Sequence, residues 1–183
     1  MKFPNKQETL RPHDLAVVLA LAVRKDAPTA TFSQLGATLG LSQSTVCEAL
    51  QRLKGAGLVR PGTREPNRRA LRDFVEHGAR YAFPPSFGGE VRGVPTAHSG
   101  PSLRHEFDGG DEVVWPDGKG QMHGRALAPL YPNAVSLPSR APEVYDALTL
   151  VDAIRGGQAR ERNAAVMALD ALLVGKAEVD AGK

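Results

Sequence analysis

The stretch that decides the fold is residues 32–59, FSQLGATLGLSQSTVCEALQRLKGAGLV. Apolar residues recur there at helical spacing on both sides of Gly40, namely Leu35, Leu39, Val46, Ala49, Leu50 and Leu53. Ser33 and Ser42 stand where a hydroxyl can cap the start of each helix. Gly40 permits a sharp turn, and Gly36 and Ala37 are small enough for two helices to touch. The stretch therefore predicts a helix-turn-helix.

The same residues carry a family resemblance. From Leu35 to Val59 the chain follows the pattern L-x-x-x-L-G-L-S-x-S-T-V-x-x-x-L-x-x-L-x-x-x-G-L-V. It thereby resembles the winged helix-turn-helix regulators, particularly those of MarR type, over about residues 12–60. The resemblance implies a bacterial-type transcriptional regulator that binds double-stranded DNA. Members usually follow "GLV" with a β-hairpin wing, whereas Pro61, Gly62 and Pro66 crowd that space here. Because proline lacks a ladder donor, we expect a short or degenerate wing.

The helix expected at 43–54 supplies the candidate DNA contacts. If Val46 faces the core, steps of about 100° per residue place Ser44, Glu48 and Gln51 on the opposite side. Flanking that face are Gln43, Thr45 and Arg52. Such hydroxyl, amide and charged groups read base edges in the major groove. Ser42, at the positive end of the helix, suits a phosphate. The expected phosphate clamps are Arg60, Arg64, Arg68 and Arg69.

Each of these features also has an explanation that involves no DNA binding. Winged helices also serve as protein-contact modules, and a polar outer face is what any solvated helix shows. The arginines at 60–69 are equally compatible with a solvated, charged turn.

Outside this stretch, the pattern predicts a helix from about Pro12 to Lys25, a short strand at Leu58–Arg60, and a helix from Asn67 to about Tyr81. Residues 81–140 hold 8 prolines and 9 glycines, yet they also hold many large apolar residues. We expect an ordered, loop-rich segment with one or two short strands, one of them at Glu112–Trp115. Two helices follow, one beginning at Pro142 and one spanning Ala159 to Leu173.

The expected fold class is therefore mainly α, with four segments. Residues 1–80 form the winged helix-turn-helix DNA-binding domain, and residues 81–140 the Pro/Gly-rich ordered segment. Residues 141–175 form a C-terminal helical pair, which either packs within the monomer or dimerises. Residues 176–183 form a disordered tail.

Charge is distributed unevenly along the chain. The formal net charge is +3, but residues 1–80 carry +6 and residues 81–183 carry −3. This asymmetry indicates that the first half faces a polyanion. Cys47 is the single cysteine, which excludes an internal disulfide framework. Since no apolar run approaches the ~20 residues of a spanning helix, and the N-terminus lacks an apolar h-region, we expect a cytoplasmic protein.

Three function classes follow from these observations. The first is a sequence-specific DNA-binding transcriptional regulator acting as a homodimer, which we predict. The second is an antitoxin-type autorepressor whose residues 81–183 bind a partner protein. The third is a metal-dependent enzyme that uses His98, His105, Glu106, Asp108 and His123, whose spacing matches no short metal motif. We expect no enzymatic activity, metal or cofactor, because the sequence has no nucleophile elbow, P-loop or dinucleotide fingerprint.

Overall fold

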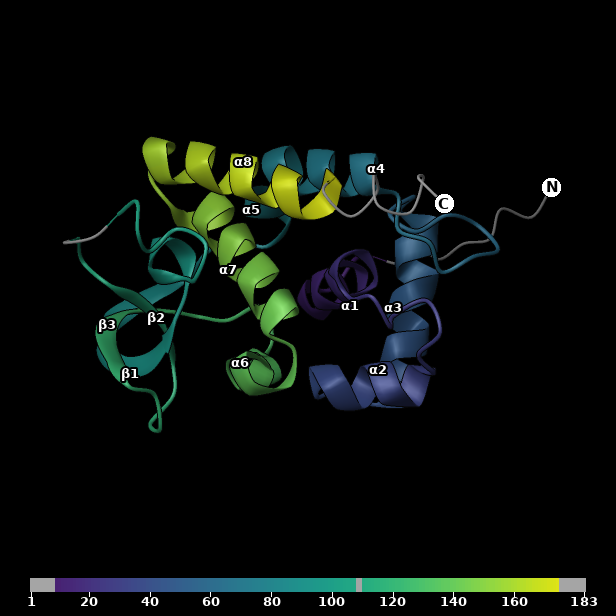
Figure 1. Cartoon of the computed structure of the whole chain (residues 1–183), viewed down its shortest axis with the longest axis horizontal. Helices are drawn as coiled ribbons and strands as arrows, with labels where there is room; N and C mark the ends of the chain where they lie inside the picture. The colour runs from purple at the N-terminus through teal and green to yellow at the C-terminus, as the bar shows by residue number, and fades with distance from the viewer. Residues whose placement is uncertain (1–8, 108–109, 175–183) are drawn as a thin grey trace.

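The helix α1 (Pro12–Val23) lies at the centre of the molecule. In the computed structural model, which describes residues 9–107 and 110–174, every residue from Asp14 to Val23 is buried. A helix that is apolar on nearly all sides must be covered on all sides. The helices α2 (Phe32–Leu39) and α3 (Gln43–Gly55) cover it on one side, and the C-terminal helices α7 (Pro142–Gly156) and α8 (Ala159–Val174) on the other (Figure 1). Pro12 occupies the first turn, as predicted, but the helix ends at Val23 rather than Lys25.

The helix-turn-helix consists of α2 (Phe32–Leu39) and α3 (Gln43–Gly55). The cap of α2 is Thr31, whose hydroxyl accepts a hydrogen bond from the Gln34 amide, so the prediction of Ser33 as the cap is wrong. Gly40 adopts φ +69°, a left-handed conformation that favours glycine. A Cβ on Gly36 would lie 2.6 Å from the Leu41 carbonyl oxygen, which confirms Gly36 as a close-contact residue. Ala37, in contrast, is exposed.

The predicted fourth helix is continuous but changes type. It comprises α4 (Arg68–Asp73), a π-helical turn (Phe74–Gly78) and α5 (Ala79–Ala82). Asn67 caps it, as predicted, by accepting a hydrogen bond from the Ala70 amide.

The middle segment folds into a small closed sheet of three strands, β1 (Phe87–Pro95), β2 (Val113–Pro116) and β3 (Met122–Leu127). β1 runs antiparallel to both other strands, while β2 and β3 pair in parallel. The expectation of short strands in this segment is confirmed, with one at Val113–Pro116 close to the predicted Glu112–Trp115. The long strand β1 was not predicted, because its glycines and charged residues show no clear apolar alternation.

The chain returns to the helical part through a 3₁₀ turn (Pro132–Ser136) and α6 (Leu137–Arg140). It ends in α7 (Pro142–Gly156) and α8 (Ala159–Val174). The two C-terminal helices pack within the chain: Arg72 of α4 donates to Asp170 of α8 at 2.9 Å, and α7 is buried from Ala147 to Arg155. Buried apolar side chains from Leu15 to Leu173 belong to one continuous cluster. The tail predicted at 176–183 lies outside the described residues.

A buried carboxylate joins the sheet to α7. Asp152 is fully buried and accepts hydrogen bonds from Thr96 Oγ1 at 2.7 Å, Trp115 Nε1 at 2.6 Å and Arg155 Nε at 2.8 Å. Arg155 then donates to the carbonyls of Phe83 and Ala128, each at 3.0 Å. Because a buried charge must be paired and hydrogen-bonded, this network fixes how the sheet sits on the helices.

Among the described residues, the structure has no helix with the length and apolar character needed to cross a bilayer.

Candidate nucleic-acid interface

The helix α3 presents one apolar and one polar face, as the sequence predicts. Val46, Leu50 and Leu53 are at most 2% exposed and pack in the core, which confirms the register. On the opposite face, the exposed residues are Gln43, Ser44, Glu48 and Gln51. The outer side of α3 therefore carries amide, hydroxyl and carboxylate groups that water, or a bound ligand, can reach.

Hydroxyl groups cluster where α3 begins. Ser42 Oγ accepts a hydrogen bond from the Thr45 amide at 3.1 Å and lies 2.9 Å from Ser44 Oγ and 2.8 Å from Thr45 Oγ1. The predicted helix cap at Ser42 is confirmed. Its oxygen serves the helix itself, although the side chains of Ser42 and Ser44 are both exposed.

The wing is reduced to a tight turn. Val59 and Pro66 form an isolated β-bridge, and two backbone hydrogen bonds flank it, from the Arg60 amide to Glu65 and from the Asn67 amide to Leu58. Gly62, at φ +72°, sits in the turn. The prediction of a short wing is confirmed, and the strand expected at Leu58–Arg60 amounts to that single bridge.

Residues 9–70 match the model of the MarR family. This segment is a MarR-like winged helix-turn-helix, a domain of DNA-binding transcriptional regulators, and it makes up about one third of the chain. No curated protein and no solved structure matches the chain.

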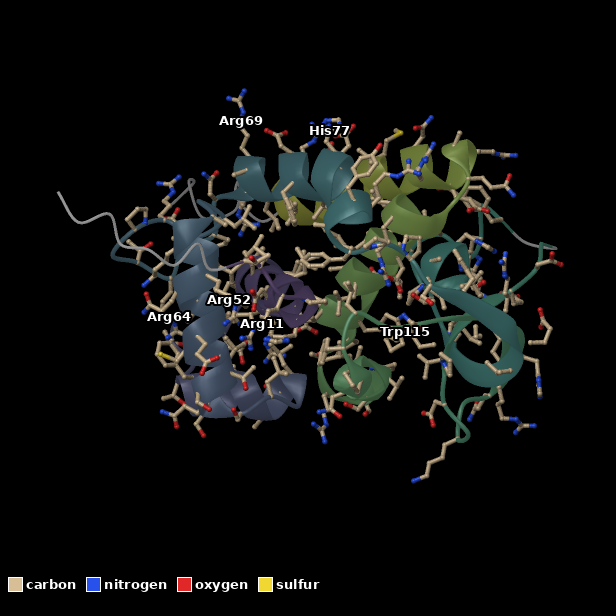
Figure 2. All side chains as sticks on the ribbon, turned by 180° about the vertical axis from the view of Figure 1, so that it is seen from behind. Arg11, Arg52, Arg64, Arg69, His77 and Trp115 are labelled. Atoms are coloured by element: carbon tan, nitrogen blue, oxygen red, sulfur yellow. The ribbon has the colours of Figure 1, made fainter. Side chains whose placement is uncertain are left out.

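Within the MarR-like domain, Arg52 does not flank the outer face of α3, which corrects the sequence prediction. Its side chain is only 5% exposed, and its guanidinium makes two 2.8 Å hydrogen bonds to the carboxylate of Asp14, which is 1% exposed. Its Nη1 also lies 3.7 Å from Glu48 Oε2. The bidentate pair ties α3 to the first turn of α1, so Arg52 holds the position of the MarR-like domain's third helix (Figure 2).

The four predicted phosphate clamps are not brought together. Arg64 turns toward the body of the MarR-like domain, with its guanidinium 4.9 Å from the centre of the Phe32 ring and 3.4 Å from the Ala27 carbonyl oxygen. Arg68 donates to the Leu173 carbonyl at 2.7 Å and so caps α8. Arg60 and Arg69 are exposed, and Figure 2 shows Arg69 extending away from the body. Arg64 and Arg68 thus have structural partners within the chain, and the exposed Arg60 has a surface ion pair, with its Nε 3.8 Å from Glu65 Oε1.

Sequence reasoning missed the groups beside Arg52. Asp14 also accepts from the Arg11 amide at 2.8 Å, and His13 Nε2 lies 3.3 Å from Arg52 Nη2. Burial lowers the pKa of His13 below its usual value, and the Arg52 charge adds to this effect while Asp14 opposes it. A carboxylate within an otherwise apolar helix was the available signal, because such a residue needs a buried partner.

The candidate metal ligands are dispersed over the part of the chain that the structure describes, where no three histidine, cysteine or acidic side chains gather to hold an ion. His98 is placed between the Asp111 carbonyl, at 2.9 Å, and Glu161, at 3.4 Å. His105 and His123 are exposed, and Asp108 lies outside the described residues.

Proposed function

We propose that this protein is a sequence-specific transcriptional regulator that reads the major groove of double-stranded DNA with α3. The observation that carries the proposal is the exposed polar face of α3, directly opposite its buried stripe. Ser44, Glu48 and Gln51 are its base-reading residues, flanked by Gln43 and Thr45. The hydroxyl, amide and carboxylate groups of this face match the donors and acceptors of base edges.

In this proposal, the exposed arginines of the MarR-like domain contact the DNA phosphates. Arg60 lies in the reduced wing and Arg69 in the first turn of α4, and both side chains reach solvent. Arg64 and Arg68 contribute less, because moving to a phosphate would break the contacts that they make with Ala27 and Leu173. Neutralising phosphates releases counterions, so binding weakens as salt concentration rises.

A two-part variant experiment separates base reading from phosphate contact. The probes are a duplex selected from a random-sequence pool by the wild-type protein and its scrambled counterpart. Ser44→Ala and Gln51→Ala should reduce the preference for the selected duplex by about 1–3 kcal/mol each. Arg60→Ala and Arg69→Ala should weaken binding to both duplexes alike and lower the salt slope by about one unit each. Equal discrimination by wild type and the α3 variants would refute base reading by this helix.

The regulator is further proposed to act in the cytoplasm as a homodimer, since paired half-sites raise both affinity and specificity. Light scattering of the purified chain, alone and with the selected duplex, tests the dimer. A single copy on the duplex would contradict it.

One observation favours a second candidate function, the binding of a partner protein by residues 81–183. Among the described residues, Tyr81 on α5 and Met167 on α8 are the large apolar side chains that are exposed, at 75% and 74%. A hollow between these helices is lined partly by Tyr81, Ile154 and Val166. If a partner binds here, Met167→Glu should abolish its stoichiometric co-purification and leave DNA affinity unchanged.

A further inference from the structure

The carbonyl groups at the C-terminal end of α2 need hydrogen-bond donors from outside the helix. The last four carbonyls of a helix have no partner within it, and in a helix-turn-helix they lie beside the turn that sets the angle of the reading helix. The amides of Gly40 and Leu41 both donate to the Gly36 carbonyl. Carbonyls nearer the turn therefore need partners from elsewhere or from water.

Two of these partners come from the second half of the chain. Asn133 Nδ2 donates to the Gly40 carbonyl at 2.6 Å, and Arg140 Nη1 lies 3.4 Å from the Ala37 carbonyl oxygen. The approach at Gly40 is close, because a Cβ added there would lie 2.9 Å from Asn133 Cβ. The segment formed by residues 128–140, here named the brace, thus contacts the turn more than 90 residues away in sequence.

The brace is itself anchored at both ends. At its start, buried Arg155 donates to the Ala128 carbonyl at 3.0 Å, and the same arginine pairs with Asp152, which holds Trp115 of the sheet. At its end, Leu137 and the following Ala141 are fully buried in the core. Figure 1 shows α6 between α2 and the sheet, beneath α7. Contacts fixed at both ends give the brace a defined position against the turn.

We propose that Asn133 is a positioning residue for DNA reading: it holds the α2–α3 turn so that α3 meets the major groove at one angle. The inference rests on the proposed function. Sequence is read through contacts to base edges, which need a defined helix angle, whereas phosphate contacts carry no sequence information. An interface ordered before binding avoids an entropic cost on binding. Losing the Asn133 contact should therefore weaken specific binding and spare non-specific binding.

The test compares three variants of the full-length chain. Asn133→Ala removes the donor, and Asn133→Asp keeps the shape but turns an acceptor toward the Gly40 carbonyl. Ser139→Ala is the matched control, because its hydroxyl donates only to Ser136 within the brace. Hydrogen exchange measures opening of the turn at the Gly40 and Leu41 amides. Fluorescence anisotropy measures affinity for the selected and scrambled duplexes.

We expect faster hydrogen exchange at the Gly40 and Leu41 amides in both Asn133 variants. Their affinity for the selected duplex should fall by about two- to tenfold, which corresponds to the net free energy of one hydrogen bond. Affinity for the scrambled duplex and the salt slope should match wild type and Ser139→Ala. If wild type discriminates between the duplexes and both Asn133 variants do so equally well, the positioning role is wrong. If wild type binds neither duplex, the proposed function fails, and the positioning role fails with it.

Discussion

Replacing Arg52 by methionine tests whether this arginine serves the fold or the DNA. The substitution keeps an unbranched apolar stem and removes the guanidinium. Asp14, 1% exposed, would lose both 2.8 Å hydrogen bonds and keep the one from the Arg11 amide. Leaving a buried charge without its partner costs about 3–5 kcal/mol. For a domain whose free energy of unfolding is about 5–15 kcal/mol, that is a large fraction.

The assay is urea unfolding followed by the fluorescence of Trp115, which is 1% exposed in the folded state. With a denaturant slope of about 2–3 kcal/mol/M, the midpoint should fall by about 1–2.5 M. The double variant Asp14→Asn/Arg52→Met removes the unpaired charge of Asp14 and keeps a side-chain oxygen that accepts from the Arg11 amide. It should recover more than half of the lost stability, as expected when a buried pair is replaced as a unit.

DNA affinity completes the experiment. Because Arg52 points away from the outer face of α3, the folded double variant should bind the selected duplex within about threefold of wild type, less than the effect of one good base contact. If Arg52→Met keeps wild-type stability and loses DNA binding, the arginine reads DNA and the structural role given to the Asp14 pair is wrong.

Four further substitutions probe the packing that positions the interface. Gly36→Ala places a methyl group against the Leu41 carbonyl and should cost about 1–3 kcal/mol in urea unfolding; an unchanged midpoint would show that the turn can shift at no cost. Because burial lowers the pKa of His13 in the folded state, the unfolded state takes up the proton more readily, and this residue's contribution to stability is lost as pH falls below about 6.5. His13→Gln should accordingly flatten the pH dependence of the unfolding free energy between about pH 7 and 5, and parallel profiles would contradict this. Asp152→Asn removes the buried counter-charge of Arg155 and should lower the free energy of unfolding by about 3–5 kcal/mol. Trp115→Phe, which removes one hydrogen bond to Asp152, should lower it by only about 1–3 kcal/mol. Comparable thermal midpoints for wild type and Asp152→Asn would exclude the network as a stabilising element.

Local features of the domain were predictable from the sequence. The register of α3 follows from apolar spacing, the caps at Ser42 and Asn67 follow from side chains that compete for backbone amides, and the short wing follows from its prolines. Each of these depends on residues within about one or two helical turns. The prediction of Ser33 as the cap of α2 is wrong because Thr31 and Ser33 are both able to cap a helix, and the capping box with Gln34 favours Thr31.

Features set by distant residues were not predictable in this way. Position 52 flanks the polar face by helical geometry, and only Asp14, 38 residues earlier, explains why its side chain turns inward. The sequence places Arg68 among the phosphate clamps, and only the Leu173 carbonyl at the end of α8, 105 residues later, explains its actual contact. The contact of Asn133 with Gly40 and the pairing of β1 also join segments far apart in sequence, where apolar periodicity carries no information.

The central claim, that α3 enters the major groove, is tested most directly by methylation protection of guanine N7, an atom that faces that groove. The protein is added to a duplex selected from a random pool, and reactivity at each guanine is compared with and without it. Wild-type protein should protect guanines within the selected site, and Ser44→Ala/Gln51→Ala should lose that protection while keeping salt-sensitive binding. Wild-type binding that leaves every guanine N7 reactive, or no salt-sensitive binding at all, would contradict the account.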